Sequence, residues 1–267
     1  LDFMIHRTLP DGSHFRWGDG GFFDRNVFDT VPLAIEFRHA AAYSLRAPKA
    51  LTPTAWPWGP LADDRLHDPE AIKQEPLSVL FDGIGMLVAR NRWGADATHV
   101  SFKAGDNYWS HVHLDQGAFT IHRGAPLAID SGFYYGYGTD HHLNYHYQTI
   151  AHNSITVTDP DDTVPAPAAK EGDKPRPIAN DGGQRRVGSG WGVERAPLDL
   201  DEWQAKRAIY HTGLIAAHLD ADGVSAALAD IRPAYTNELS GKRSFSHRTR
   251  RVERCWRFFA YDRVDDV

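Results

Sequence analysis

From residue 78 onwards, the apolar side chains of this chain come in short runs that are separated by turn-forming residues. The clearest runs are residues 79–81, 85–90, 99–102 and 118–121. Short runs of this kind, bounded by turn signals and repeated along a chain, are typical of the strands of a β-sandwich. We therefore predict a mainly β fold with an antiparallel β-sandwich domain over residues 78–267, including later strands near 206–218 and 224–230.

The first 77 residues have a different pattern. Residues 30–46 have apolar side chains at helical spacing, with Thr30 as a capping residue and Pro32 in the first turn, so a helix is expected there. A second short helical piece is expected at 68–74. The glycine-rich turn at 17–21 is either part of a cleft wall or a plain connector, and both interpretations stay open.

Composition excludes several classes of protein. The 267 residues carry a net charge of −6 and include one cysteine, so no intramolecular disulfide framework exists. No apolar run is long enough to predict a membrane span. No aromatic RNA-reading motif and no phosphate-binding glycine loop occurs, so a nucleic-acid partner is not expected.

Two later stretches are predicted to be peripheral. Residues 159–190 contain five prolines and no apolar period, which predicts a loop. Residues 242–257 carry seven Lys or Arg against one Glu. Basic tracts bind polyanions, but alternating arginines on a strand are more often a solvated face, and we favour the second interpretation.

Histidine is unusually concentrated in the middle of the chain. Seven of the fifteen histidines lie between His111 and His152. Histidine is the commonest metal ligand in proteins and titrates nearest neutral pH, so this concentration suggests a site. For the pair His141 and His142 we favour a solvated loop instead.

The spacing of these residues suggests how they meet. On an extended strand His111, His113 and Asp115 would share one face. Asp130 ends an apolar run and precedes a turn, and His152 opens another apolar run, 153–157. Two histidines and one carboxylate from three neighbouring strands would make a three-ligand set with an open position, which suits zinc or a similar divalent ion.

Three ordered motifs resemble the heparinase II/III-like polysaccharide lyases, most closely heparinase II and its broad-specificity relatives. They are KAGD…SHVHLDQGAF from Lys103, GAPLAIDSG from Gly124 and TIAHNS from Thr149. The resemblance covers residues 7–159 well and the remainder more loosely. It implies a helical (α/α) toroid followed by an antiparallel β-sandwich. Residues 1–77 would then be the last helices of the toroid, and residues 78–267 a sandwich that is incomplete at its C-terminus.

The same resemblance implies roles for individual residues. His113, Asp130 and His152 would bind one divalent ion, expected to be zinc with a mainly structural role, while His111 would face the substrate cleft as a catalytic residue. The implied reaction is β-elimination in a uronate polysaccharide, such as heparin, heparan sulfate or alginate. The implied location is periplasmic or secreted, and a homodimer stays open.

β-Elimination needs a base for the C5 proton and an acid for the O4 leaving group. His111 is the expected base, and Tyr145 or Tyr147 the expected acid. Tyr134, Tyr135 and Tyr137 could stack on sugar rings. Two alternatives stay open. One is a sandwich-type hydrolase whose metal activates water. The other is a non-catalytic carbohydrate-binding module that uses only the aromatic surfaces.

Overall fold

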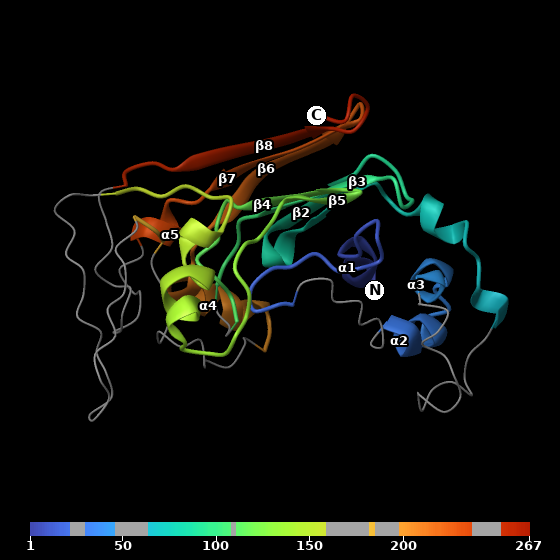
Figure 1. Cartoon of the computed structure of the whole chain (residues 1–267), viewed down its shortest axis with the longest axis horizontal. Coiled ribbons are helices and arrows are strands. Elements are labelled where there is room, and N and C mark those ends of the chain that lie inside the picture. Colours follow the sequence, from blue (N-terminus) through green and yellow to red (C-terminus); the bar gives the residue numbers. More distant parts are fainter. Residues whose placement is uncertain (22–29, 46–63, 108–110, 159–181, 185–197, 237–251) are drawn as a thin grey trace.

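The computed structural model describes residues 1–21, 30–45, 64–107, 111–158, 182–184, 198–236 and 252–267. Most of the regular structure is antiparallel sheet, arranged in two layers with short helices below them (Figure 1). The prediction of a mainly β chain with an antiparallel sandwich after short helices is confirmed.

The first sheet has five strands in sequence order, all antiparallel. Its strands are β1 (Ser78–Phe81), β2 (Met86–Arg90), β3 (Thr98–Lys103), β4 (Phe119–Arg123) and β5 (Ala125–Ala128). Four of the predicted apolar runs become β1 to β4. Every residue of β2 and β3 is buried, so these central strands form the interior of the sheet.

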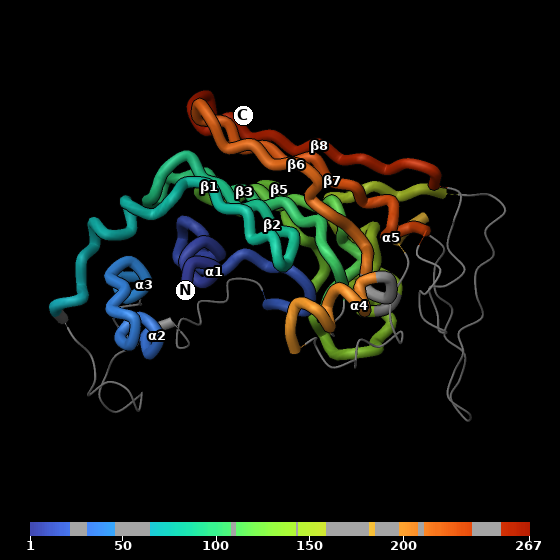
Figure 2. Tube along the Cα trace, turned by 180° about the vertical axis from the view of Figure 1, so that it is seen from behind, coloured from blue at the N-terminus to red at the C-terminus, as the bar shows by residue number. Residues whose placement is uncertain are grey.

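The second sheet has three antiparallel strands, β6 (Leu214–Ala221), β7 (Val224–Asp230) and β8 (Trp256–Asp262). It lies over the first sheet in both views (Figures 1 and 2). The ring of Phe102 on β3 stacks on that of Phe259 on β8, with centroids 5.2 Å apart. Leu87 from the first sheet and Ile215 and Ala227 from the second belong to the same buried cluster. Burial of apolar area between the sheets is the main force that holds such a sandwich together.

The helices are short and lie mostly outside the sandwich. They are α1 (Asp2–His6), α2 (Thr30–Glu36), α3 (Ala40–Ser44), α4 (Leu200–Tyr210) and α5 (Pro233–Thr236), with single turns at η2 (Asp64–Leu66), η3 (Ala71–Gln74), η4 (Asp82–Ile84), η5 (His142–His146) and η6 (Thr149–Ala151). α1, α2 and α3 share their own buried cluster around Ile5, Ala42 and Tyr43. The division into toroid helices at 1–77 and a sandwich at 78–267 stays a prediction.

Three local predictions are wrong. The single helix expected over 30–46 is two helices, because Arg38 between them adopts a left-handed conformation with φ 51°. Residues 206–210 belong to α4, where Asp199 caps the helix by accepting the N–H of Glu202 at 2.8 Å, so the strand begins only at Leu214. Residues 153–157 form no strand.

Two other predictions concern segments that the structure covers only in part. The loop expected at 159–190 lies outside the described residues except for 182–184. The basic tract at 242–257 is described only from residue 252, and its last two residues begin β8. Among the helices of the described residues, none is long and apolar enough to cross a membrane.

Candidate active site and metal site

The histidine-rich segment 111–116 forms a turn beside β3. The N–H of Leu114 donates to the carbonyl of Tyr147 at 3.1 Å, and the side-chain amide of Asn107 donates to the carbonyl of His113 at 3.2 Å. His111 has φ 67°, which is the left-handed region. The prediction that His111, His113 and Asp115 share one face of an extended strand is therefore wrong.

Asp115 has a different role from the neighbouring histidines. Its carboxylate is fully buried and accepts two hydrogen bonds from the ammonium of Lys103, at 2.7 and 2.8 Å. A buried charge is tolerated when it is paired in this way. The pair fastens the turn at 111–116 to the end of β3.

His113, Asp130 and His152 do meet. One ligand atom from each lies within 4.8 Å of the others, and all three side chains are buried. His113 Nδ1, Asp130 Oδ2 and His152 Nε2 have no hydrogen-bond partner among the described residues. Buried polar atoms without partners cost free energy, and a divalent ion bound by two imidazoles and a carboxylate would satisfy them. The residues present therefore fit the expected metal.

The three candidate ligands come from loops and not from three neighbouring strands, which corrects the geometric argument that suggested them. Asp130 lies two residues after β5, and His152 follows η6 directly. The buried guanidinium of Arg16 donates to the backbone carbonyls of residues 130–132, at 2.7 Å for Gly132. The side-chain amide of Asn153 donates to the carbonyls of Phe119 and Ile129, at 2.8 and 3.0 Å. These bonds hold the two loops together.

Asp19 is a residue of the site that the sequence analysis did not identify. Its Oδ2 lies 2.7 Å from His111 Nδ1, and its Oδ1 lies 2.9 Å from His113 Nε2. Burial would raise the pKa of the Asp19 carboxyl, but the hydrogen bonds from His113, His142 and His111 outweigh burial and hold that pKa well below its usual range. The signal in the sequence was the glycine-rich turn at 17–21, one of whose two interpretations was a cleft wall.

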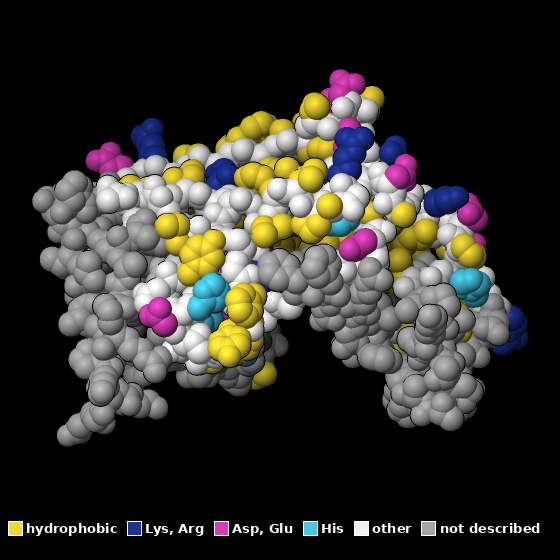
Figure 3. Space-filling view, viewed as in Figure 1, with side chains coloured by type: hydrophobic (Ala, Val, Ile, Leu, Met, Phe, Trp, Pro, Cys, Tyr) yellow, Lys and Arg dark blue, Asp and Glu magenta, His cyan; other side chains and the backbone are white. Residues whose placement is uncertain are grey.

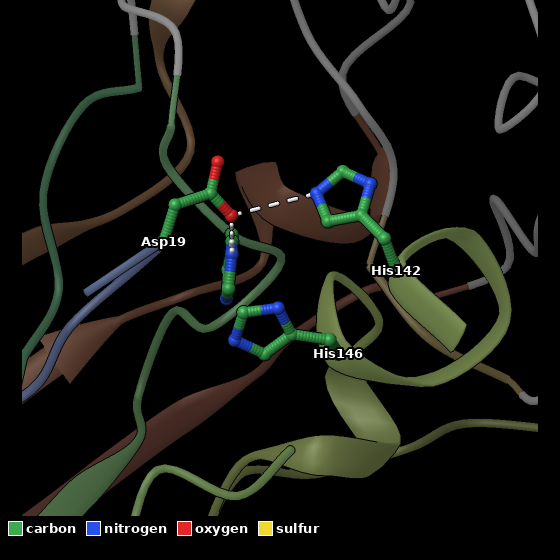
Figure 4. Close-up of side chains that lie close together, drawn as sticks. Asp19, His142 and His146 are labelled. Atoms are coloured by element: carbon green, nitrogen blue, oxygen red, sulfur yellow. Dashed lines mark hydrogen bonds and ion pairs between the residues drawn. The ribbon is translucent and has the colours of Figure 1, made fainter. Parts of the chain in front are cut away.

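His142 and His146 also lie in this site, on the single π-helical turn η5. Figure 4 shows the His142 ring directed at the Asp19 carboxylate and the His146 ring beside it. His142 Nε2 is 3.4 Å from Asp19 Oδ1, and His146 packs edge-on against His113 with ring centroids 4.5 Å apart. The prediction that His141 and His142 lie in a solvated loop is wrong for His142, of which 2% is exposed.

Two buried histidines of the site, His113 and His146, are kept neutral. Burial lowers the pKa of His113, and the Asp19 carboxylate opposes that effect only in part. Burial also lowers the pKa of His146 to about 3, and the neighbouring Arg16 guanidinium lowers it further. A neutral imidazole retains a lone pair, and this is the form of histidine that binds metal ions.

The tyrosines fall into two groups. Tyr147 is 6% exposed and packs against the His113 ring at 5.6 Å, so it forms part of the wall behind the site. Tyr145 is 37% exposed, and its hydroxyl lies 2.9 Å from Ser131 Oγ. Tyr134, Tyr135 and Tyr137 are all exposed at the surface. Figure 3 shows hydrophobic side chains gathered around a histidine at the lower left of this face.

A pocket opens beside His111. It is lined by Trp17, Gly18, Lys103 and Asp106, among others, and by His111 itself. The His111 side chain is 61% exposed, in contrast to His113 next to it, which is fully buried. One histidine of the pair is thus open to a ligand, and the other is enclosed.

Comparison with known proteins agrees with the motif resemblance. Residues 73–203 match the family model described as Heparinase II/III-like, C-terminal. This part of the chain is similar to that family. A heparin-sulfate lyase from Bacteroides stercoris is 38% identical over 92 residues, which are 33% of this chain and 14% of that protein.

Solved structures that are similar to this chain include two lyases. Heparan sulfate lyase HepC from Pedobacter heparinus gives a TM-score of 0.48 at 16% identity, covering 86% of this chain and 27% of that one. A heparinase III structure gives a TM-score of 0.45 at 19% identity, covering 88% of this chain and 28% of that one. The chain thus spans less than a third of the length of these proteins. The heparinase II/III-like region, residues 73–203, includes His111, His113, Asp130 and His152, whereas Asp19 lies outside it.

Proposed function

We propose that this chain carries part of the active site of a lyase that cleaves a uronate polysaccharide by β-elimination. The observation that carries the proposal is the contrast between two histidines on one turn. His113 is enclosed with Asp130 and His152, while His111 is exposed beside a pocket. The likeness of residues 73–203 to the heparinase II/III-like family supports the same conclusion.

In the proposed reaction His111 removes the C5 proton of a uronate. Its Nδ1 faces Asp19, so Nε2 is the nitrogen left to accept that proton. The proton on C5 becomes acidic only when charge that develops on the uronate carboxylate is stabilised. Lys103 lines the pocket, but its ammonium is already paired with Asp115, so we assign it no part in this stabilisation.

For the acid that protonates the O4 leaving group, the proposal favours Tyr145 over Tyr147. Tyr145 is the more exposed of the two, and the Ser131 hydroxyl at 2.9 Å orients its phenol group. Tyr147 packs behind His113 and supports the wall of the site. Removal of the C5 proton and departure of the protonated O4 group would yield a 4,5-unsaturated uronide.

His113, Asp130 and His152 would hold one divalent ion, and zinc is proposed because imidazole and carboxylate ligands suit it. When bound, the ion would supply a rigid cross-link between the turn at 111–116 and the loops at 130 and 152. Because all three residues are buried, we propose a structural role that fixes His111 in place and no direct contact with substrate.

Tyr134, Tyr135 and Tyr137 would supply a stacking surface for neighbouring sugar rings. They are 38%, 74% and 44% exposed, and Tyr135 stands edge-on to Phe133 at 5.9 Å. Aromatic faces bind the apolar faces of sugars, whereas the charged groups of a uronate need separate partners. Tyr135→Ala should then raise KM more than it lowers kcat.

The substrate class that we propose is heparin or heparan sulfate, because the curated relative is a heparin-sulfate lyase. Alginate and the other uronate polymers undergo the same elimination. We also propose a periplasmic or secreted location, where the protein would encounter such polymers.

The test is incubation of the full-length protein with heparin, heparan sulfate, chondroitin, hyaluronan and alginate, followed by the ultraviolet absorbance of the unsaturated product. A new absorbance with at least one polymer is expected. Cleavage that produces saturated ends would indicate the hydrolase alternative, and binding without any cleavage would indicate the binding-module alternative. Either result would contradict the lyase proposal.

A further inference from the structure

One carboxylate touches both of the histidines to which the proposed function gives different roles. Asp19 Oδ2 is 2.7 Å from His111 Nδ1, and Asp19 Oδ1 is 2.9 Å from His113 Nε2. The Asp19 side chain is 6% exposed, so water competes little for either contact. The inference rests on the proposed function, in which His111 is the base and His113 is a metal ligand.

The chemistry of a carboxylate decides which ring nitrogens carry protons. An ionised carboxylate only accepts hydrogen bonds, so the nitrogen that faces it must be the N–H donor. In a neutral imidazole the other nitrogen then keeps its lone pair. Applied to this site, the lone pairs fall on His111 Nε2 and His113 Nδ1. The second of these is buried and has no hydrogen-bond partner among the described residues.

We propose that Asp19 is a positioning residue that sets the tautomers of both histidines with one carboxylate. It turns the lone pair of His111 outward to act as a base, and the lone pair of His113 inward to bind the ion. A carboxylate that orients a catalytic histidine and one that orients a metal-binding histidine are both common arrangements. Here Asp19 performs both tasks.

The backbone around Asp19 is built to keep it in this position. The N–H of Asp19 donates to the carbonyl of His111 at 3.3 Å, so the two residues are joined through backbone and side chain. The indole N–H of Trp17 donates to Ser101 Oγ on β3 at 3.2 Å, and Arg16 binds the loop that carries Asp130. The segment 16–19 is thus fastened by contacts at Arg16, Trp17 and Asp19 itself.

A competing interpretation makes Asp19 a ligand of a second ion. Asp19, His113, His142 and His146 each present one ligand atom within 4.8 Å of the others. However, His142 Nδ1 accepts the backbone N–H of Gly138 at 3.2 Å. A neutral His142 must then carry its proton on Nε2, which is the nitrogen that faces Asp19 at 3.4 Å. A protonated nitrogen cannot bind a metal, so this geometry disfavours His142 as a ligand of a second ion.

The first measurement is nitrogen NMR of the histidine side chains in the unaltered protein, without substrate. We expect His111 to be protonated on Nδ1 and His113 on Nε2. The reverse tautomer at either residue would overturn the proposal, and this result does not depend on whether any variant folds.

The second measurement uses Asp19→Asn, whose amide has one accepting oxygen and therefore cannot accept from both histidines. We expect the tautomer of at least one histidine to change and kcat to fall by about 10²-fold or more, with KM nearly unchanged. Asp96→Asn, at an exposed carboxylate outside the site, is the matched control and should change neither the tautomers nor kcat. Unchanged tautomers in Asp19→Asn would overturn the proposal.

Metal content separates the remaining interpretations. Binding of two zinc ions by the unaltered protein and of one by Asp19→Asn would make Asp19 a ligand and would overturn its positioning role. If the tautomers change as expected but neither protein cleaves any polysaccharide, the proposed function is wrong while the positioning of the two imidazoles stands.

Discussion

The backbone of Gly18 lies against the carbonyl oxygen of His111. A β-carbon at residue 18 would overlap that oxygen. Gly18 also has φ +69°, a conformation that other residues adopt at a cost. This close approach lets the N–H of Asp19 reach the His111 carbonyl. The absence of a side chain at residue 18 is therefore a condition for the contact between Asp19 and His111.

Gly18→Ala should destabilise the protein by more than the cost of a left-handed alanine, which is about 1–2 kcal/mol. Gly12→Ala is the matched control, because Gly12 has φ +80° and no atom near its added β-carbon. The free energy of unfolding of both variants is measured in urea. Equal losses would show that the approach of Gly18 to His111 contributes nothing.

Loss of a metal ligand should lower metal content and thermal stability together. His113→Ala removes a buried ligand candidate, and an ion that binds only the folded state stabilises it by about 2.7 kcal/mol at a concentration of 100 times its Kd. Bound zinc per chain and Tm are measured with and without a chelator. His218→Ala, at an exposed histidine of β6, is the control. If His113→Ala retains its zinc, the ligand assignment is wrong.

The buried ion pair between Lys103 and Asp115 should be sensitive to removal of one partner. Asp115→Ala leaves the Lys103 ammonium without its buried partner. It should lower the free energy of unfolding, measured in urea, by about 3–5 kcal/mol. The double variant Lys103→Met with Asp115→Leu removes both charges and should cost less. A double variant that is less stable than Asp115→Ala would contradict this account.

Stability should fall on acidification because several histidines are buried without charge. Burial, assisted by Arg90, lowers the pKa of His6 to about 4, whereas an unfolded histidine titrates near 6.5. Between these pH values the unfolded chain binds a proton on His6 that the folded chain does not. The contribution of His6 to the free energy of unfolding therefore rises with pH across this window and is constant above it.

His6→Phe keeps an aromatic ring between Phe81 and Trp93 and removes the titrating group. Its urea midpoint should therefore fall less between about pH 7 and about pH 5 than that of the unaltered protein. His218→Phe should leave the pH dependence as it is. An equal fall in His6→Phe would show that His6 does not contribute to the acid sensitivity.

The sandwich could be predicted from sequence because its signals are local. Four apolar runs with turn residues between them became β1 to β4, and the later strand expected at 224–230 is β7. The strand expected at 206–218 began late because the capping carboxylate of Asp199 and the acidic first turn that follows favour a helix.

The candidate site was predicted by motif more than by geometry. His113, Asp130 and His152 meet as expected, but they do so on loops, where no strand period applies. Asp19 could not be placed from the sequence, because its contact with His111 spans 92 positions and depends on the tertiary fold. The sequence predicts a surface position for His142, because burial on a single helical turn leaves no periodic signal.

The most direct test of the account is the activity of His111→Ala, with metal content and Tm measured on the same sample. The general base should contribute about 10²–10⁴-fold, so we expect β-elimination to fall by at least 10²-fold while zinc content and Tm stay nearly unchanged. Near-normal elimination by His111→Ala, or loss of its metal, would contradict the assignment of His111 as the base.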